Sequence, residues 1–158
     1  MSAQKKRVVI LMADDDSGDI QLARKVLDRS PLRSDFRSVS DGDSLMDYLH
    51  RRGAYPDAAA APRPGVILLD LNMPGKLGLE ALREIKSDPE LRRIPVIILT
   101  TSNAAQDIVR CYDSGANAFM TKPATFDALR DLLLAFEHYW ITTATLPDGT
   151  EGIRELRD

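Results

Sequence analysis

The fold depends on the stretch Val66-Ile67-Leu68-Leu69-Asp70-Leu71-Asn72-Met73-Pro74-Gly75. Its apolar start, with two β-branched residues, and its Pro-Gly exit predict a short parallel strand buried on both faces. A carboxylate directly after such a strand is costly unless it reaches solvent, a metal or a cation. We therefore expect Asp70 at the carboxyl edge of a sheet, facing a pocket. The alternative is that Asp70 only caps the following turn.

The composition fits one domain with one sizeable core, since the chain has 158 residues and 44% hydrophobic content. A net charge of -3 with scattered basic residues disfavours direct binding to nucleic acid. No apolar run approaches the roughly 18 residues of a membrane helix, and the N-terminus does not resemble a signal peptide. The single cysteine, Cys111, excludes an internal disulfide. A cytoplasmic protein is the simplest interpretation.

Four further segments read as strands, and most of them end in polar residues. Residues 8–12 lead into Asp14 and Asp15, residues 36–39 form a weaker strand, residues 95–99 lead into Thr100, and residues 118–121 lead into Lys122. Apolar residues at helical spacing follow each of the five strands. This alternation predicts an α/β fold, a doubly wound parallel sheet with helices on both faces.

Several residues predict where the helices begin. Asp16 suits the N-cap of the first helix, with Asp19 favourable in its first turn, and Thr125 suits the N-cap of the last. Asn103 and Gln106 resemble a capping box for the fourth helix. Apolar residues follow a 3.6 period along the last helix, at Phe126, Leu129, Leu132, Leu133, Phe136 and Trp140.

The polar strand ends define a candidate site, because ligands of open parallel sheets bind outside the carboxyl ends of the strands. Asp14, Asp15 and Asp70 would repel one another unless a cation neutralises them, and the lack of nearby His or Cys favours Mg²⁺. With Lys122 and Thr100 these groups could hold a phosphoryl group, and a carboxylate could be the nucleophile. Taken singly, each has a structural alternative: a helix cap for Asp14, Asp15 or Thr100, and a solvated lysine for Lys122.

Four motifs, taken in order, resemble those of the receiver domains of bacterial two-component response regulators. They are Asp14-Asp15, Leu69-Asp70-Leu71-Asn72-Met73-Pro74, Leu99-Thr100-Thr101-Ser102 and Thr121-Lys122-Pro123. The resemblance covers residues 7–139. It implies a flavodoxin-like (βα)5 sheet with strand order 2-1-3-4-5, a receiver domain over residues 1–145, and a tail over residues 146–158 with no output domain.

The resemblance also implies roles for the site residues. Asp70 would accept the phosphoryl group of a histidine kinase. Mg²⁺ would be held by Asp70, by Asp15 directly, by Asp14 through water and by the backbone carbonyl of Asn72. Lys122 would contact the phosphoryl oxygens.

The remaining implied roles concern the signal. Thr100 would be the switch hydroxyl, and Phe119 the aromatic residue that turns inward after phosphorylation. The Lys122–Pro123 peptide would be cis. Phe119 lacks the tyrosine hydroxyl often found at this position in the family.

A narrower resemblance concerns residues 51–65 and residues 136–147, which look like stand-alone receivers paired with bacterial phytochrome histidine kinases. It implies a red/far-red light signal and a homodimer formed by the fourth helix, fifth strand and fifth helix. Leu134 and Tyr139 lie off the apolar stripe of the last helix, and with Trp140 they would leave apolar surface for a partner. The alternative is that the C-terminal stretch folds back on its own domain.

Three rival interpretations belong to other classes. An aspartyl-phosphate phosphatase of the haloacid-dehalogenase type needs a second acid where this chain has Asn72. A flavodoxin-like electron carrier would bind flavin phosphate beside the acidic loop at residues 14–18, which would repel it. A receiver fold could also serve as a scaffold without phosphorylation. We therefore expect a signalling domain rather than an enzyme, one that catalyses at most its own phosphorylation and dephosphorylation.

Overall fold

The computed structural model describes residues 7–147, in which five parallel strands form one sheet in the order β2-β1-β3-β4-β5. The α/β class and the strand order 2-1-3-4-5 are thereby confirmed. Along the chain the elements are β1 (Val9–Ala13), α1 (Ser17–Arg29), β2 (Asp35–Val39), α2 (Gly42–His50), β3 (Val66–Leu69), α3 (Gly78–Ser87), β4 (Val96–Thr100), α4 (Ala105–Asp113), β5 (Ala118–Thr121), α5 (Phe126–Glu137) and a π-helical turn, η1 (His138–Thr143).

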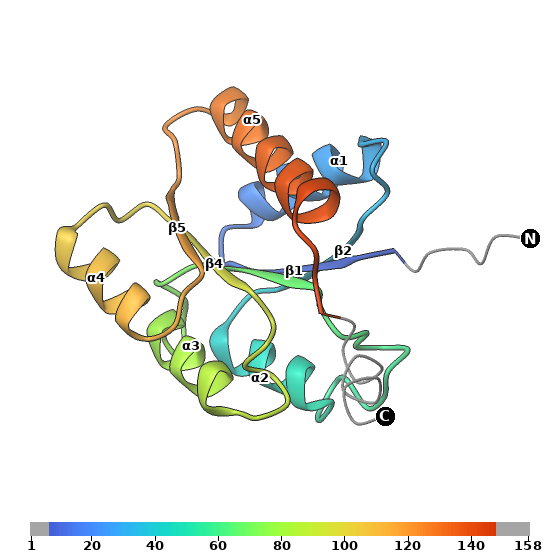
Figure 1. Cartoon of the computed structure of the whole chain (residues 1–158), viewed down its shortest axis with the longest axis vertical. Coiled ribbons are helices and arrows are strands. Elements are labelled where there is room, and N and C mark those ends of the chain that lie inside the picture. Colours follow the sequence, from blue (N-terminus) through green and yellow to red (C-terminus); the bar gives the residue numbers. More distant parts are fainter. Residues whose placement is uncertain (1–6, 148–158) are drawn as a thin grey trace, which may run out of the picture.

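The helices cover both faces of the sheet, with α1 and α5 on one face and α2, α3 and α4 on the other (Figure 1). All residues of β1, β3 and β4 are buried, because helices pack against them on both sides. Alternate residues of β3 enter different cores: Leu68 joins the core under α1 and α5, and Leu69 joins the core under α2 and α3.

Two of the predicted helix starts are confirmed. Asp16 Oδ1 accepts the backbone N–H of Asp19 at 3.0 Å, and Thr125 Oγ1 accepts that of Ala128 at 3.1 Å. These side chains partner backbone donors that the first turn of a helix leaves free.

The predicted capping box of α4 is wrong. The helix begins at Ala105, and its N-cap residue, Ala104, offers no side-chain hydrogen bond. The side chain of Ser102 makes the hydrogen bonds at this helix start. Its hydroxyl accepts the N–H of Ala104 at 3.3 Å and donates to Asp107 at 2.6 Å. A polar side chain two residues further from the helix therefore organises its start.

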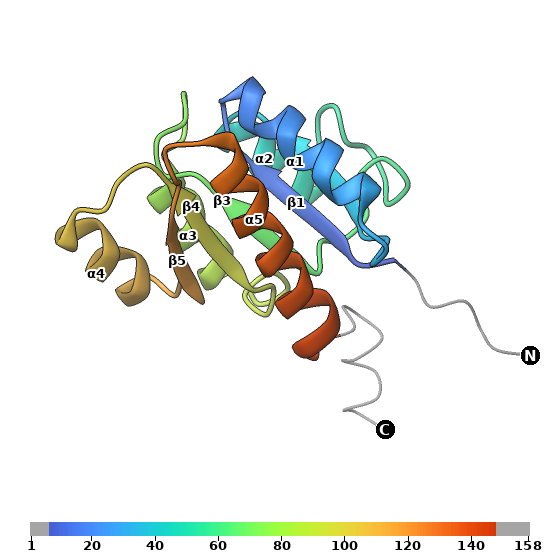
Figure 2. The same cartoon turned by 90° about the horizontal axis from the view of Figure 1, so that it is seen from above.

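Parts of two predicted apolar stripes face outward. In α4 only Cys111 is buried, while Val109 and Tyr112 are 57% and 49% exposed. This helix lies beside β5 at the edge of the molecule (Figure 2), where less of the sheet is available to cover it. In α5 Leu129, Leu133 and Phe136 are buried as predicted, but Phe126 in the first turn is 64% exposed.

The connection between α2 and β3 is held to the body by hydrogen bonds to its backbone. The Tyr48 hydroxyl donates to the carbonyl of Pro62 at 2.7 Å, and Arg63 donates to the carbonyl of Leu49 at 2.8 Å. None of the helices within residues 7–147 is long and apolar enough to span a membrane. Most of the predicted C-terminal tail, residues 148–158, lies outside the described residues.

Candidate phosphoacceptor site

The carboxyl ends of four strands bring the predicted polar residues to one edge of the sheet. Asp14 and Asp15 follow β1, Asp70 follows β3, Thr100 ends β4 and Lys122 follows β5. One carboxylate oxygen from each of Asp14, Asp15 and Asp70 lies within 4.8 Å of the others. Asp14 and Asp70 are buried, and Asp15 is exposed. The predicted convergence of these carboxylates is confirmed.

Backbone donors fix the two buried carboxylates. Asp14 Oδ1 accepts the N–H of Asp16 at 2.9 Å, and Asp70 Oδ1 accepts the N–H of Asn72 at 3.3 Å. The second oxygen of each carboxylate, Oδ2, faces the Lys122 ammonium. Asn72 itself is exposed in the loop that leaves β3.

Lys122 reaches into this acidic cluster. Its Nζ lies 2.7 Å from Asp14 Oδ2, 2.9 Å from Asp19 Oδ2 and 3.6 Å from Asp70 Oδ2. The Lys122 side chain is only 7% exposed. Its backbone N–H donates to the carbonyl of Thr100 at 2.7 Å, which fixes the start of the loop after β5. The ammonium thus faces three carboxylates in a partly desolvated space.

Burial and pairing act in opposite directions on the charges of the cluster. Burial raises the pKa of Asp14 to about 6, although Lys122 and the N–H of Asp16 pull it down. Burial by itself would lower the pKa of Lys122, but the close contacts of its ammonium with the carboxylates of Asp14 and Asp19 outweigh burial and raise that pKa above its usual range. Lys122 is therefore a permanent cation, whereas Asp14 carries a charge that the fold only partly compensates.

Two oxygens at this edge lack a hydrogen-bond partner among the described residues, Asp14 Oδ2 and Thr100 Oγ1. The contact of Asp14 Oδ2 with Lys122 is an ion pair without hydrogen-bond angles. Three carboxylates this close together, offering only oxygen ligands, fit a hard divalent cation such as Mg²⁺ beside the Lys122 ammonium.

Two further predictions concern the ring of Phe119 and the peptide bond after Lys122. Phe119 of β5 is partly buried and packs against the core under α2 and α3. The described residues contain no cis peptide bond, so the predicted cis Lys122–Pro123 peptide is wrong. The trans form is favoured even before proline.

Asp19 is a member of the cluster that the sequence interpretation missed. Its position suggested only a favourable acid in the first turn of a helix, yet its carboxylate pairs with Lys122. A usable signal existed: Asp16 already caps the helix, so the side chain of Asp19 is free for another contact.

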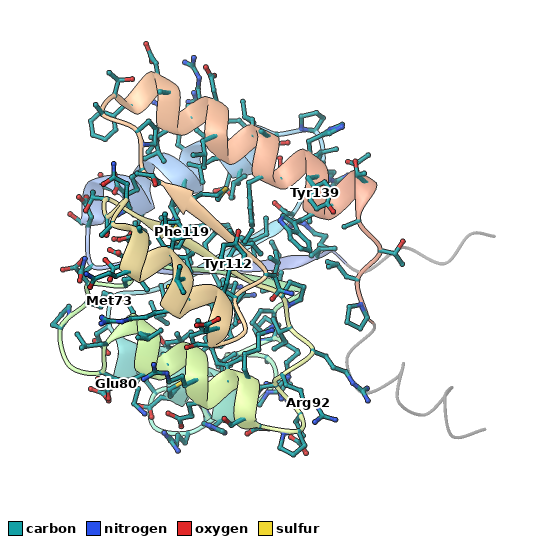
Figure 3. All side chains as sticks on the ribbon, turned by 60° about the vertical axis from the view of Figure 1, so that its left-hand side comes forward. Met73, Glu80, Arg92, Tyr112, Phe119 and Tyr139 are labelled. Carbon is teal, nitrogen blue, oxygen red and sulfur yellow. The ribbon has the colours of Figure 1, made fainter. Side chains whose placement is uncertain are left out.

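The predicted interface residues lie away from this site. Tyr139 is 52% exposed and Leu134 39% exposed, and the Tyr139 ring meets that of the partly buried Trp140 edge-on at 5.1 Å. Figure 3 shows Tyr139 at the end of the molecule opposite Met73, which lies in the loop after β3. An interface at Tyr139 would thus leave the acidic cluster open.

A doubly wound sheet with buried carboxylates and a lysine at its carboxyl edge defines an α/β signalling domain of the receiver class. A family model described as "Response regulator receiver domain" matches residues 10–134. The chain belongs to this family.

Named relatives within this family are response regulators, two of them described as phytochrome response regulators. Response regulator Rcp1 of Synechocystis sp. is 39% identical over 139 residues, which are 88% of this chain and 92% of Rcp1. The Mn²⁺-bound crystal structure of Rcp1 covers 89% of this chain and 99% of its own, at 38% identity and a TM-score of 0.82. The phosphorylated cyanobacterial phytochrome response regulator RcpA is 42% identical over 90% of this chain and all of its own, with a TM-score of 0.85. The bacteriophytochrome response regulator AtBRR is 34% identical over 91% of this chain and all of its own, with a TM-score of 0.69.

Proposed function

We propose that this receiver accepts a phosphoryl group on Asp70 from a histidine kinase, in a reaction that needs Mg²⁺, and signals by contact with other proteins. The observation that carries the proposal is the group of three carboxylates within 4.8 Å of one another, with the Lys122 ammonium 3.6 Å from Asp70. The receiver domain would comprise residues 1–145, with residues 146–158 as a tail.

In the proposed reaction an oxygen of Asp70 forms a bond to phosphorus as the bond between phosphorus and the donor nitrogen breaks. The hydrogen bond from the N–H of Asn72 orients the Asp70 carboxylate. Asp14, Asp15, Asp70 and the carbonyl of Asn72 would hold Mg²⁺, which would supply positive charge to the phosphoryl oxygens. Lys122 adds a fixed positive charge, with its Nζ 3.6 Å from Asp70 Oδ2.

The signal would begin at Thr100. Its buried hydroxyl makes no hydrogen bond within the described residues, so a phosphoryl oxygen on Asp70 would provide a partner. Movement of Thr100 would open space for the ring of Phe119, which is already partly buried on the neighbouring strand. A local charge change would thus become a change in packing near α4.

A bacterial phytochrome is the proposed kinase. The resemblance of residues 51–65 and 136–147 to phytochrome-associated receivers supports it, as do relatives named as phytochrome response regulators. The exposed Leu134 and Tyr139, with Trp140 beside Tyr139, support a homodimer formed by α4, β5 and α5.

The test is the intact mass of the protein after incubation with Mg²⁺ and acetyl phosphate, for the wild type and for Asp70→Asn. The expected result is a labile phosphoryl adduct on the wild type that disappears with EDTA and is absent from the variant. An adduct of equal yield on Asp70→Asn would remove Asp70 from its role. No adduct on either protein would favour a scaffold that works without phosphorylation.

A further inference from the structure

Lys122 is bound more closely by a residue of α1 than by the proposed phosphoacceptor. Its Nζ lies 2.9 Å from Asp19 Oδ2 but 3.6 Å from Asp70 Oδ2. Both partners of the closer pair are largely buried, with side chains 7% and 12% exposed. Water therefore screens this ion pair less than it screens a surface pair.

The position of Asp19 is set by a short series of hydrogen bonds in the loop after β1. The N–H of Asp16 donates to Asp14, and the side chain of Asp16 accepts the N–H of Asp19. The backbone at Asp19 is thus tied to the same loop that supplies Asp14 and Asp15. Its carboxylate approaches Lys122 from the first turn of α1.

We propose that Asp19 is a positioning residue that holds Lys122 on the α1 side of the pocket and competes with a phosphoryl group on Asp70 for the lysine ammonium. This inference rests on the proposed function of Asp70. It assigns to the pocket a fourth carboxylate whose effect opposes that of the metal ligands, because it weakens the hold of Lys122 on the phosphoryl oxygens.

The carboxylates of the pocket differ in what they do when the site is filled. Asp14, Asp15 and Asp70 form the group suited to a cation, and Asp19 is not part of that group. The negative charge of Asp19 therefore stays available to Lys122 after the others are neutralised. It also repels a phosphoryl group nearby, since like charges at short range in a partly buried site interact strongly.

A purely structural role predicts something different. An acid in the first turn stabilises a helix through its dipole and leaves ligand binding at the pocket unchanged. Two substitutions of Asp19 separate these roles. One removes the negative charge but keeps an oxygen that can accept a hydrogen bond, and the other removes both.

The experiment measures binding of beryllofluoride, a stable mimic of the phosphoryl group, by calorimetry at saturating Mg²⁺. Asp19→Asn removes the charge and keeps an oxygen that can accept from Lys122, whereas Asp19→Ala removes both. Asp127→Asn is the matched control, because it removes an acid from the first turn of α5 whose side chain is 88% exposed.

Asp19→Asn is expected to tighten beryllofluoride binding about fivefold, and Asp19→Ala at least as much, while Asp127→Asn matches the wild type. Unchanged or weaker binding by Asp19→Asn would overturn the inference, with the proposed function left standing as long as the wild type binds. Should Asp19→Ala fail to fold, Asp19→Asn alone decides. Absence of binding by the wild type would instead overturn the proposed function, and the inference with it.

Discussion

Gly78 lies so close to the main chain after β3 that a Cβ atom at this position would stand 2.2 Å from the carbonyl oxygen of Asp70. The backbone N–H of Gly78 also donates to the carbonyl of Leu71 at 3.0 Å. The first turn of α3 is therefore in direct contact with the backbone that carries the proposed phosphoacceptor.

The first prediction is that Gly78→Ala destabilises the protein by about 1 to 3 kcal/mol, because the new methyl group must displace backbone rather than a flexible side chain. Urea unfolding measures the loss. Gly18→Ala is the milder comparison: its Cβ would meet Asp16 Oδ1, the side-chain oxygen that caps α1, at 3.2 Å, and alanine is favoured inside a helix. Equal stabilities of the two variants would show that the contact of Gly78 with Asp70 is not limiting.

The second prediction concerns pH. Burial raises the pKa of Asp14 from 3.8 to about 6, so the folded protein binds more protons than the unfolded chain between these values. The contribution of Asp14 to stability therefore falls as pH rises through this window and stays low above it. Replacing the carboxylate by a neutral amide should stabilise the protein at pH 7.5 by about 1 to 3 kcal/mol.

The measurement compares the free energies of unfolding of wild type and Asp14→Asn at pH 4 and pH 7.5, in the presence of EDTA. The gain of the variant should appear at pH 7.5 and vanish at pH 4, where the wild-type carboxyl is protonated. Asp131→Asn, with a side chain 71% exposed, controls for the change in net charge. The same difference at both pH values would contradict the assignment.

Sequence alone could predict the sheet and most of the site, because both depend on local patterns. Strands buried on both faces are continuous apolar runs, and the parallel order forces their polar ends to one edge. The partnership of Asp19 with Lys122 joins residues more than 100 positions apart, and it depends on where the fold places the first turn of α1 relative to the loop after β5.

Exposure was harder to predict than helix formation. The spacing of Val109 and Tyr112 correctly indicates a helix, but which side of α4 meets the sheet depends on how far the edge strand β5 extends beneath it. The start of α4 was missed for a similar reason, since Ser102 reaches Ala104 and Asp107 from outside the helix.

The third prediction is that Thr100→Val leaves the unmodified protein as stable as the wild type, or more stable by about 1 kcal/mol. The Thr100 hydroxyl is buried without a hydrogen-bond partner among the described residues, so its removal costs nothing there. Ser34→Ala is the contrast, because it breaks a buried 2.6 Å hydrogen bond to Glu137 and should cost about 1 to 3 kcal/mol.

The same Thr100→Val variant should still accept a phosphoryl group on Asp70 but lose the response that follows. Hydrogen exchange of β4 and β5 with and without beryllofluoride reports that response. A strongly destabilised variant would show that the Thr100 hydroxyl already has a hydrogen-bond partner. A variant that responds to beryllofluoride like the wild type would show that the hydroxyl is not the switch.

The fourth prediction concerns assembly. Tyr139 is about half exposed in η1, directly after α5 and beside Trp140. Buried aromatic residues at the centre of an interface contribute about 2 kcal/mol or more to binding. If the homodimer uses this face, Tyr139→Ser should weaken dimerisation at least tenfold.

Light scattering across a concentration series measures the mass of the assembly. Leu77→Ser is the control, since Leu77 is 51% exposed but lies in the loop before α3. Dimers of equal strength in both variants would place the interface elsewhere, and a monomeric wild type at every concentration would reject the homodimer itself.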